Sequence, residues 1–314
     1  MLDALLGALD QAGVTLASGH RVLSIERDED GFDIQTSEQP MRAKRVIVAT
    51  GGRSLPRTGS DGYGYELVAN LGHTVTPTTP ALVPLVLEPD HWLTKLSGIA
   101  VDVTLTLSAP SGKAVYRQAG AMLLTHFGLS GPAVMDMSRH WIAARHAGEA
   151  VQLHANLTGQ DFAHVERVIQ QAGSLQPRAT AAGVLRQWVP ERLAEALCRH
   201  GARVDPSTAM GRLTREARRA LVHALTALPL AVVGDRGFAH AEVTAGGVPL
   251  EQVDLRTMAS RICPGLFLCG EILNVDGRIG GYNFQWAWCT GRLAGLAAAV
   301  GVGDARPPGS TGAE

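Results

Sequence analysis

The chain opens with apolar residues at helical spacing. Leu2, Leu5, Leu6 and Leu9 recur every three or four positions, and Gly13 follows where a left-handed C-cap would lie. The pattern predicts an amphipathic helix at the start of the chain.

Strand-like patterns follow this helix. The runs Val14–Leu16, His20–Glu26 and Phe32–Thr36 predict strands, and Asp30-Gly31 marks a hairpin-like break between the last two. The continuous apolar run Val46-Ile47-Val48-Ala49 is typical of a buried parallel strand. The first 50 positions therefore predict mixed α/β structure.

The pattern changes twice further along. From 81 to about 157 the apolar runs are short and β-rich, as in the alternating Val101–Leu107. Between 159 and 227 the chain is rich in Ala, Leu, Arg and Gln, with helical periodicity in Ala181–Cys198 and Leu213–Leu225. These segments predict a β-rich unit followed by a small helical unit.

After Pro229 the β-rich and glycine-rich character returns. It ends in an apolar strand at Leu266–Cys269 and a helix from Asn283 to Val300. We therefore predict an α/β chain with a discontinuous first domain. The expected parts are a domain of residues 1–80 and 240–300, a β-rich substrate domain of 81–158 and 228–239, a helical subdomain of 159–227 and a flexible tail of 301–314.

Composition excludes several classes of protein. Of 314 residues, 46% are hydrophobic, so the chain can bury a substantial core. Twenty-eight Lys and Arg against 29 Asp and Glu give a net charge of -1, which disfavours nucleic acid as a partner. No apolar run reaches the roughly 20 residues of a membrane span, and the N-terminus lacks the basic leader of a secretory signal. These features predict a cytoplasmic protein.

The cysteines and histidines do not form a ligand pattern. Cys198, Cys263, Cys269 and Cys289 are widely spaced and include no C-x-x-C pair. The 11 histidines show no H-E-x-x-H or comparable spacing. We predict no metal site and no disulfide framework.

The chemistry is concentrated near the C-terminal end. Gly270 and Glu271 directly follow an apolar strand, which places a carboxylate acceptor for sugar or ribityl hydroxyls at the carboxyl end of a sheet. Gly280-Gly281 precede a helix, whose first-turn N–H groups and dipole favour a diphosphate or the anionic edge of a reduced flavin. Alternatively, the glycine pair is a loop before a helix that Trp286 and Trp288 anchor in the core.

Two further glycine-containing motifs have competing interpretations. Thr50-Gly51-Gly52 follows the Val46–Ala49 run, where missing side chains permit either a close backbone approach to a ligand or a tight turn. Gly128–Pro132 begins like a G-x-S-x-G nucleophile elbow, but Pro132 replaces the last glycine. Ser130 as a helix N-cap ahead of Pro132 explains this second motif better than a hydrolase nucleophile.

The segment CGEILNVDGRIGGYNFQWAWCTGRLAG, from Cys269 to Gly295, closely resembles the C-terminal motif of the BaiN-like flavoproteins, also called aminoacetone-oxidase-like FAD-binding enzymes. Four other stretches resemble that family in the same order. They are Ile47–Gly52 with Pro56–Gly64, Pro80–Leu85, Thr125–Pro132 and Val243–Val248. The resemblance implies a two-dinucleotide-type, Rossmann-like FAD-binding domain interrupted by a β-rich substrate domain and a helical cap.

The resemblance also implies a set of cofactor contacts, although it identifies no catalytic residue. Val22 would lie beside the adenine, Glu271 would meet polyol or sugar hydroxyls, and the segment from Gly280 to Gln285 would face the isoalloxazine. The full set implied for FAD is Val22, Ala49, Thr50, Gly51, Gly52, Gly270, Glu271, Asp276, Gly280, Gly281, Tyr282, Asn283, Phe284 and Gln285.

One family element has no counterpart in the sequence. The family begins with a strand, a G-x-G-x-x-G turn and a helix that seat the FAD diphosphate. The nearest string, Gly301–Arg306, lacks the third small residue and a following helix pattern. We therefore expect an N-terminally truncated domain that binds FAD weakly or not at all by itself.

The resemblance implies an FAD-dependent oxidoreductase that transfers a hydride through the flavin to or from a small organic substrate. No second glycine-rich fingerprint supports NAD(P)H as the electron donor. One alternative is a truncated, non-catalytic remnant or binding module. Another is an RNA-associated flavoprotein that uses the stripe of Arg212, Arg215, Arg218 and Arg219, although a solvated helix face explains that stripe more simply.

Overall fold

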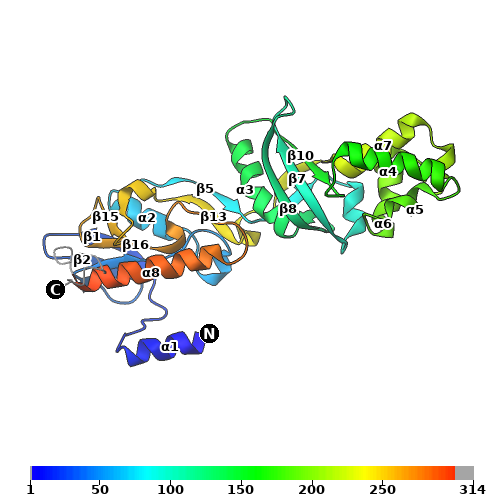
Figure 1. The fold of residues 1–314 in the computed structure, drawn as a ribbon. Coiled ribbons are helices and arrows are strands. Elements are labelled where there is room, and N and C mark those ends of the chain that lie inside the picture. The colour runs from blue at the N-terminus through cyan, green and yellow to red at the C-terminus, as the bar shows by residue number, and fades with distance from the viewer. Residues whose placement is uncertain (1, 301–314) are drawn as a thin grey trace, which may run out of the picture.

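The computed structural model describes residues 2–300, so the predicted flexible tail lies outside the described residues. Figure 1 shows an elongated molecule with three regions in a row. Small sheets and a long helix form one end, an antiparallel sheet lies in the middle, and a group of helices forms the other end. The predicted α/β class is confirmed. Within residues 2–300, no helix is long and apolar enough to cross a bilayer.

The predicted N-terminal helix forms as α1 (Leu2–Gln11), but it buries none of its residues. Its apolar stripe is exposed, with Leu2 at 67%. Figure 1 shows α1 standing away from the rest of the chain. The strand predicted at Val14–Leu16 is wrong, because this segment has no strand partner and remains irregular.

The hairpin predicted around Asp30-Gly31 is present. The strands β1 (Val22–Arg27) and β2 (Phe32–Thr36) pair antiparallel, and β3 (Met41–Ala43) extends this sheet. The Asp28 carboxylate accepts hydrogen bonds from the N–H groups of Asp30 and Gly31, at 2.8 and 2.9 Å. This side chain replaces backbone partners inside the turn and fixes the register of the hairpin.

A second sheet holds the two strands that lead into the glycine motifs. It runs in the order β14 (Val253–Asp254), β15 (Ala259–Ser260), β16 (Leu266–Leu268) and β4 (Val46–Val48). The pairing of β16 with β4 is parallel, as predicted, and β16 is completely buried. However, β4 lies at the edge of this sheet within the described chain, and Ile47 is 39% exposed. The prediction that β4 is buried is therefore only partly correct.

Helices cover this part of the molecule. The long helix α8 (Tyr282–Val300) contacts β16 and β4, and α2 (Tyr63–Asn70) contacts β1. Buried residues from these helices, from β16 and from the β1–β2 hairpin, including Phe32, Val68 and Phe267, form one hydrophobic cluster.

The middle region is an antiparallel sheet in the order β11-β10-β7-β8-β9-β6-β12. In β7, Val101, Val103, Leu105 and Leu107 are buried, in keeping with the two-residue period of a strand that has one face in the core. The strand bounds are β6 Leu85–Leu87, β7 Ala100–Ser108, β8 Ala114–Leu124, β9 Gly128–Ser130, β10 Gln152–Asn156, β11 Leu228–Leu230 and β12 Val232–Asp235.

One helix, α3 (Pro132–His146), packs against this sheet and contacts β7 and β8. Pro132 occupies its first turn, as predicted, but the N-cap is Gly131 and not Ser130. Ser130 is the last residue of β9. The N-cap prediction is therefore wrong by one position, because the strand continues further than the sequence pattern indicates.

The helical region contains α4 (Phe162–Leu175), α5 (Ala181–Leu185), α6 (Glu191–Ala196) and α7 (Arg215–Thr226). The predicted periodic segment 181–198 is two helices because Pro190 cannot donate a backbone hydrogen bond inside a helix. Buried residues of these helices and of the antiparallel sheet belong to one continuous hydrophobic cluster.

The chain crosses between the two large cores on neighbouring strands. β5 (Thr76–Ala81) leads out of the first core and β13 (Val243–Gly247) leads back, and the two pair antiparallel. A small apolar cluster of Ala81, Leu82, Met135 and Val243 lies at this junction. The junction therefore has little apolar packing compared with either core.

Candidate functional site

The parallel pairing of β4 with β16 brings two predicted motifs together. Val48 lies opposite Leu268, so Ala49–Gly52 and Cys269–Glu271 leave the sheet at the same edge. The Cys269 N–H donates to the Val48 carbonyl at 3.2 Å. This edge is the carboxyl end of both strands, where open α/β sheets bind ligands.

The Glu271 carboxylate is held in place at this edge. Its Oε1 atom accepts a hydrogen bond from the Thr244 N–H at 2.9 Å. Its Oε2 atom accepts no hydrogen bond from the described residues, and can therefore receive one from a ligand hydroxyl. Burial raises the pKa of Glu271, and the hydrogen bonds from Thr244 oppose that shift.

Thr244 is a residue that the sequence did not single out. It is completely buried on β13, and its Oγ1 accepts hydrogen bonds from the N–H groups of Arg53 and Ser54 at 2.8 and 3.1 Å. Thr244 therefore joins the segment after β4 to Glu271. It lies in the Val243–Val248 stretch, which resembles the family. That resemblance is the sequence signal that could have identified Thr244 as a site residue.

The two glycines after β4 serve the packing of the protein. Gly51 has a φ of 72°, and the Ser60 hydroxyl donates to the Thr50 carbonyl at 2.9 Å across the turn. A Cβ on Gly52 would lie 2.5 Å from Glu271 Oε1. The tight-turn interpretation therefore explains Gly51, and Gly52 makes room for a carboxylate of the protein.

Gly270 connects the strand end to α8. Its N–H donates to Thr290 Oγ1 at 3.0 Å, and its carbonyl accepts from Trp286 Nε1 at 3.1 Å. Trp286 thus anchors the helix as the alternative interpretation predicted, whereas Trp288 is 52% exposed. The hydrogen bonds of Trp286 and Thr290 to Gly270 therefore fix the position of α8 relative to Glu271.

The first turn of α8 faces open space. Gly280 and Gly281 have φ values of 119° and 90°, and a Cβ on Gly281 would meet no atom within 4 Å. In residues 2–300, the N–H groups of Tyr282, Asn283 and Phe284 donate to no protein acceptor, as expected for a first turn. Phe284 is 75% exposed. This helix end is therefore available to a negatively charged or polar group.

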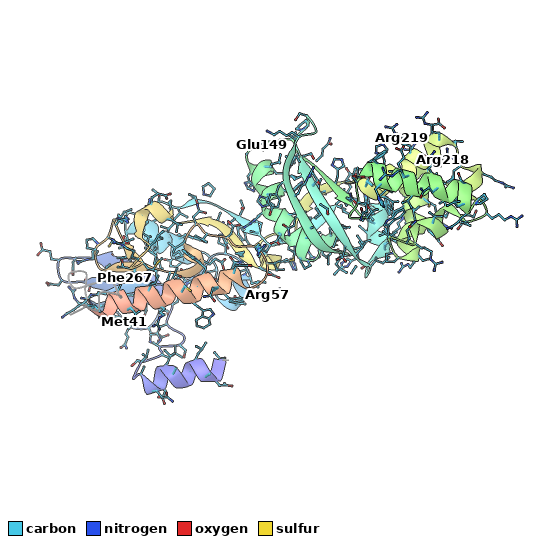
Figure 2. All side chains as sticks on the ribbon, in the orientation of Figure 1. Met41, Arg57, Glu149, Arg218, Arg219 and Phe267 are labelled. Atoms are coloured by element: carbon cyan, nitrogen blue, oxygen red, sulfur yellow. The ribbon has the colours of Figure 1, made fainter. Side chains whose placement is uncertain are left out.

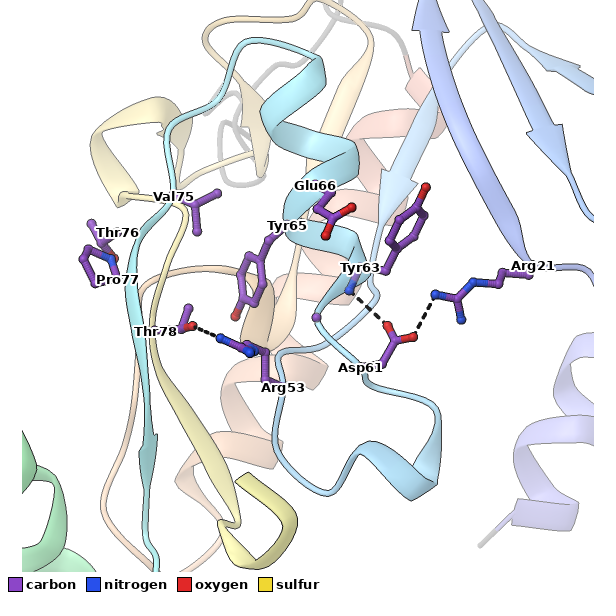
Figure 3. A pocket seen from close by; sticks show the side chains of 11 residues that line it. Arg21, Arg53, Asp61, Tyr63, Tyr65, Glu66, Val75, Thr76, Pro77 and Thr78 are labelled. Carbon is purple, nitrogen blue, oxygen red and sulfur yellow. Dashed lines mark hydrogen bonds and ion pairs between the residues drawn. The ribbon is translucent and has the colours of Figure 1, made fainter. Parts of the chain in front are cut away.

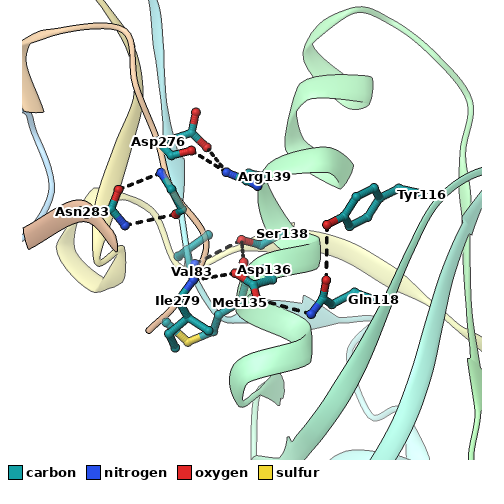
Figure 4. A network of polar contacts seen from close by, with 11 residues as sticks. Val83, Tyr116, Gln118, Met135, Asp136, Ser138, Arg139, Asp276, Ile279 and Asn283 are labelled. Carbon is teal, nitrogen blue, oxygen red and sulfur yellow. Dashed lines mark hydrogen bonds and ion pairs between the residues drawn. The ribbon is translucent and has the colours of Figure 1, made fainter. Parts of the chain in front are cut away.

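The loop before α8 is tied to helix α3 of the middle region (Figure 4). The Asp276 carboxylate pairs with Arg139 of α3 at 2.8 Å, and the buried Asp136 accepts from the Ile279 N–H at 2.7 Å. Asn283 closes the loop on itself, since its Oδ1 accepts from the Gly277 N–H at 2.7 Å. Asp276 and Asn283 thus hold protein groups, and Gln285 donates to Cys289 Sγ at 3.0 Å.

The remaining predicted residue, Val22, lies apart from this cluster. It is half-buried at the start of β1. Beyond it, a cavity of about 550 Å³ opens between α2 and β5 (Figure 3). None of the predicted cofactor residues lines this cavity, whose lining is Arg21, Arg53, Asp61, Gly62, Tyr63, Tyr65, Glu66, Val75, Thr76, Pro77 and Thr78.

Tyr65 connects this cavity with the cluster around Glu271. Its hydroxyl donates to the Glu271 carbonyl at 3.3 Å, and burial raises the pKa of Tyr65 far above its ordinary value. Tyr65 therefore stays neutral and keeps donating. The structure brings Ala49–Gly52, Gly270, Glu271 and the start of α8 together, whereas Val22 lies at the start of β1.

The donor and acceptor set of the cluster fits part of FAD. Glu271 Oε2 is an acceptor for polyol hydroxyls, and the first turn of α8 offers N–H donors for the polar edge of a flavin. These groups lie on two elements that Gly270, Trp286 and Thr290 hold together. Glu271 and the first turn of α8 thus offer hydrogen-bonding groups that suit the polyol and the isoalloxazine of FAD.

Comparisons with known proteins show the family of the chain. The sequence profile of the HI0933-like protein Rossmann domain matches residues 1–297. The chain is 34% identical to the ribosomal RNA dihydrouridine synthase of Escherichia coli (strain K12), over 92% of this chain and 69% of that protein. It is 33% identical to the enzyme of the same name from Haemophilus influenzae (strain ATCC 51907 / DSM 11121 / KW20 / Rd), over 94% of this chain and 71% of that protein.

A third relative has a different name. The 3-dehydro-bile acid delta(4,6)-reductase of Clostridium scindens (strain ATCC 35704 / DSM 5676 / VPI 13733 / 19) is 34% identical over 95% of this chain and 73% of that protein. The resemblance stated from the sequence is confirmed by these matches.

Proposed function

Since the chain belongs to the HI0933-like Rossmann-domain family of FAD-binding oxidoreductases, we propose that it is an FAD-dependent reductase of carbon–carbon double bonds. The observation that carries the proposal is the Glu271 carboxylate, held by Thr244 beside Gly52 and facing the same sheet edge as the first turn of α8. The names of all three relatives describe the saturation of a carbon–carbon double bond.

We infer that the substrate is a uracil base of ribosomal RNA. Two of the relatives carry this substrate in their names. Charge on this chain is also unevenly distributed, which the overall balance of -1 conceals. Residues 159–227 contain ten arginines, no lysine and six carboxylates, a net charge of +4, so the rest of the chain carries -5. A separated positive region suits a polyanionic substrate.

The residues of the chain hold and orient the reacting groups in this proposal. Glu271 would accept hydrogen bonds from cofactor hydroxyls through Oε2, and the α8 N-terminus would stabilise negative charge at the flavin edge. When bound, FAD supplies the hydride. In the proposed reaction, one carbon of the double bond would receive a hydride and its neighbour a proton from solvent, and NADH or NADPH would be the two-electron donor.

A second candidate is a small organic molecule with a conjugated double bond. The bile acid reductase supports it, because its identity to this chain equals that of the first RNA enzyme. The reaction type is the same, and only the class of substrate differs.

The test is reconstitution with excess FAD, because the sequence has no G-x-G-x-x-G turn. The protein, NADPH or NADH and unmodified ribosomal RNA are incubated without oxygen, and digested nucleosides are analysed by mass spectrometry. We expect a uridine nucleoside heavier by two hydrogens, absent with Glu271→Ala. Reduction of a small conjugated ketone but not of RNA would support the second candidate. A protein that gives no product with either substrate would be the non-catalytic remnant.

A further inference from the structure

The helical region carries a groove between α4 and α7 that is rich in arginine. The groove has a volume of about 280 Å³ and is lined by Arg215, Arg218, Arg219 and Val222 of α7 and by Glu166, Ile169 and Gln170 of α4. We propose that this groove, here called the arginine groove, binds the phosphate backbone of RNA. The choice of RNA rests on the proposed function.

The three arginines share one helix face. Arg215, Arg218 and Arg219 are spaced i, i+3 and i+4, so their side chains leave α7 on the same side. Opposite them, Glu166 and Gln170 have the same i, i+4 relation on α4. Three guanidinium groups therefore face the Glu166 carboxylate across the groove. Glu216 on α7 also interacts electrostatically with Arg215 and Arg218, so three cations stand against two carboxylates and a positive excess remains.

Local contacts orient the arginine side chains without neutralising them. Arg218 is half-buried and donates through Nη1 to the Leu213 carbonyl at 3.0 Å. The Arg219 guanidinium lies 5.8 Å from the centre of the Phe162 ring. Within residues 2–300, none of the three arginines forms an ion pair, whereas Arg186 and Arg199 of the same region pair with Glu191 and Glu195. The guanidinium groups of the groove thus form no ion pair that an incoming anion would have to break.

The groove also lies where a large substrate would reach. Figure 2 shows Arg218 and Arg219 at the end of the molecule opposite Phe267, which belongs to β16 next to the candidate cofactor site. The antiparallel sheet lies between the two ends. A small substrate has no need of a contact so far from the cofactor, whereas a folded RNA can span both regions. Planar guanidinium groups are also the preferred side chains for phosphate recognition.

The experiment measures RNA affinity by fluorescence anisotropy. The probe is a labelled single-stranded RNA of mixed sequence, titrated with the 314-residue protein at several salt concentrations. In the variant Arg215→Gln/Arg219→Gln both positions are exposed, so the fold should be retained. We expect affinity to fall on the order of ten-fold or more near physiological salt, and the slope of log K against log salt to decrease by about 1.4.

The matched control is Arg186→Gln/Arg199→Gln. It removes the same charge from the same region but outside the groove. We expect wild-type RNA affinity from this control. Equal loss in both variants would indicate only a diffuse electrostatic field and would overturn the proposal, as would wild-type affinity in the groove variant. Tighter binding of poly-L-glutamate than of RNA, lost in the groove variant, would assign the groove to an acidic protein and also overturn it.

Failure of this site and failure of the proposed function give different results. If uridine in RNA is converted to dihydrouridine and the groove variant binds RNA normally, the proposed reaction is supported and the proposed role of the arginine groove is wrong. If the groove variant loses RNA affinity but the wild-type protein makes no dihydrouridine, the RNA-binding role of the arginine groove is supported and the proposed reaction is wrong.

Discussion

The absence of a side chain at Gly52 makes room for Glu271, the residue that we expect to contact the cofactor. The space where its Cβ would lie is taken by Glu271 Oε1 at 2.5 Å and by the side chain of Thr244. Sequence alone indicated only that glycine was needed there, for a ligand or for a turn. The structure identifies a third reason, because the chain's own carboxylate fills the gap from a position more than 200 residues away.

The variant Gly52→Ala should therefore displace Glu271. We expect an overpacking cost of about 1–3 kcal/mol in the free energy of unfolding and a loss of FAD affinity. Gly295→Ala is the matched control, because a Cβ there meets no atom within 4 Å and alanine is favoured in a helix. Urea denaturation and FAD fluorescence titration would measure both effects. Unchanged FAD affinity in Gly52→Ala would contradict the role of Glu271.

The raised pKa of Glu271 predicts a pH dependence of stability in the FAD-free protein. Because the folded state holds this proton more tightly than the unfolded state, the carboxyl stabilises the fold at pH values below its ordinary pKa of 4.5. That contribution is lost as the pH rises through the raised pKa. The amide oxygen of Glu271→Gln can still accept from the Thr244 N–H and never ionises.

The Tm of Glu271→Gln relative to the wild-type protein should therefore increase as the pH rises above 4.5. Thermal denaturation across this range checks the prediction. A difference in Tm that stays constant or falls with pH would mean that burial of Glu271 does not disfavour its charge.

Among the elements, the loop before α8 depends on helix α3 of the middle region. Arg139 of α3 pairs with the Asp276 carboxylate, and both side chains are about one-fifth exposed, at 22% and 23%. The sequence motif from Cys269 to Gly295 indicated the loop and the helix. It could not indicate the partner, because Arg139 lies 137 residues earlier in the chain and outside every motif.

Arg139→Met should release this loop while keeping an apolar stem on α3. We expect a loss of about 1–2 kcal/mol in stability and faster hydrogen exchange in residues 276–283. Arg145→Met, an exposed position on the last turn of the same helix, is the control. If exchange in 276–283 is equal in both variants, the Arg139–Asp276 pair does not hold the loop.

Element by element, the sequence predicted what local patterns determine. The strand at β16, the parallel partner β4, the hairpin β1–β2 and helix α8 follow from periodicity and turn residues. Exposure was harder to predict. The stripe of α1 and the outer face of Ile47 are apolar but not covered by the described chain, since coverage depends on tertiary partners and not on the pattern itself.

At the scale of the whole molecule, the structure has two main cores joined by a narrow junction. One core contains the sheet of β16 and the helices α2 and α8, and the other joins the antiparallel sheet to α4–α7. The hydrophobic content of the whole chain does not show that it is divided between two cores. In the same way, the net charge of -1 does not show that the helical region is positive.

Two cores predict two unfolding transitions in scanning calorimetry. Excess FAD should raise the temperature of only one of them, because a ligand stabilises the unit to which it binds. The transition that moves should be the one that Gly52→Ala lowers. A single transition, or an equal shift of both, would show that the junction couples the cores more strongly than its small apolar cluster indicates.

The proposed activity is tested most directly by the dihydrouridine content of ribosomal RNA in cells of the source organism that lack the gene. We expect that deletion lowers this content, that the wild-type gene restores it, and that Glu271→Ala does not. Unchanged dihydrouridine in ribosomal RNA after deletion, or full restoration by Glu271→Ala, would show that the protein does not reduce ribosomal RNA through the site at Glu271.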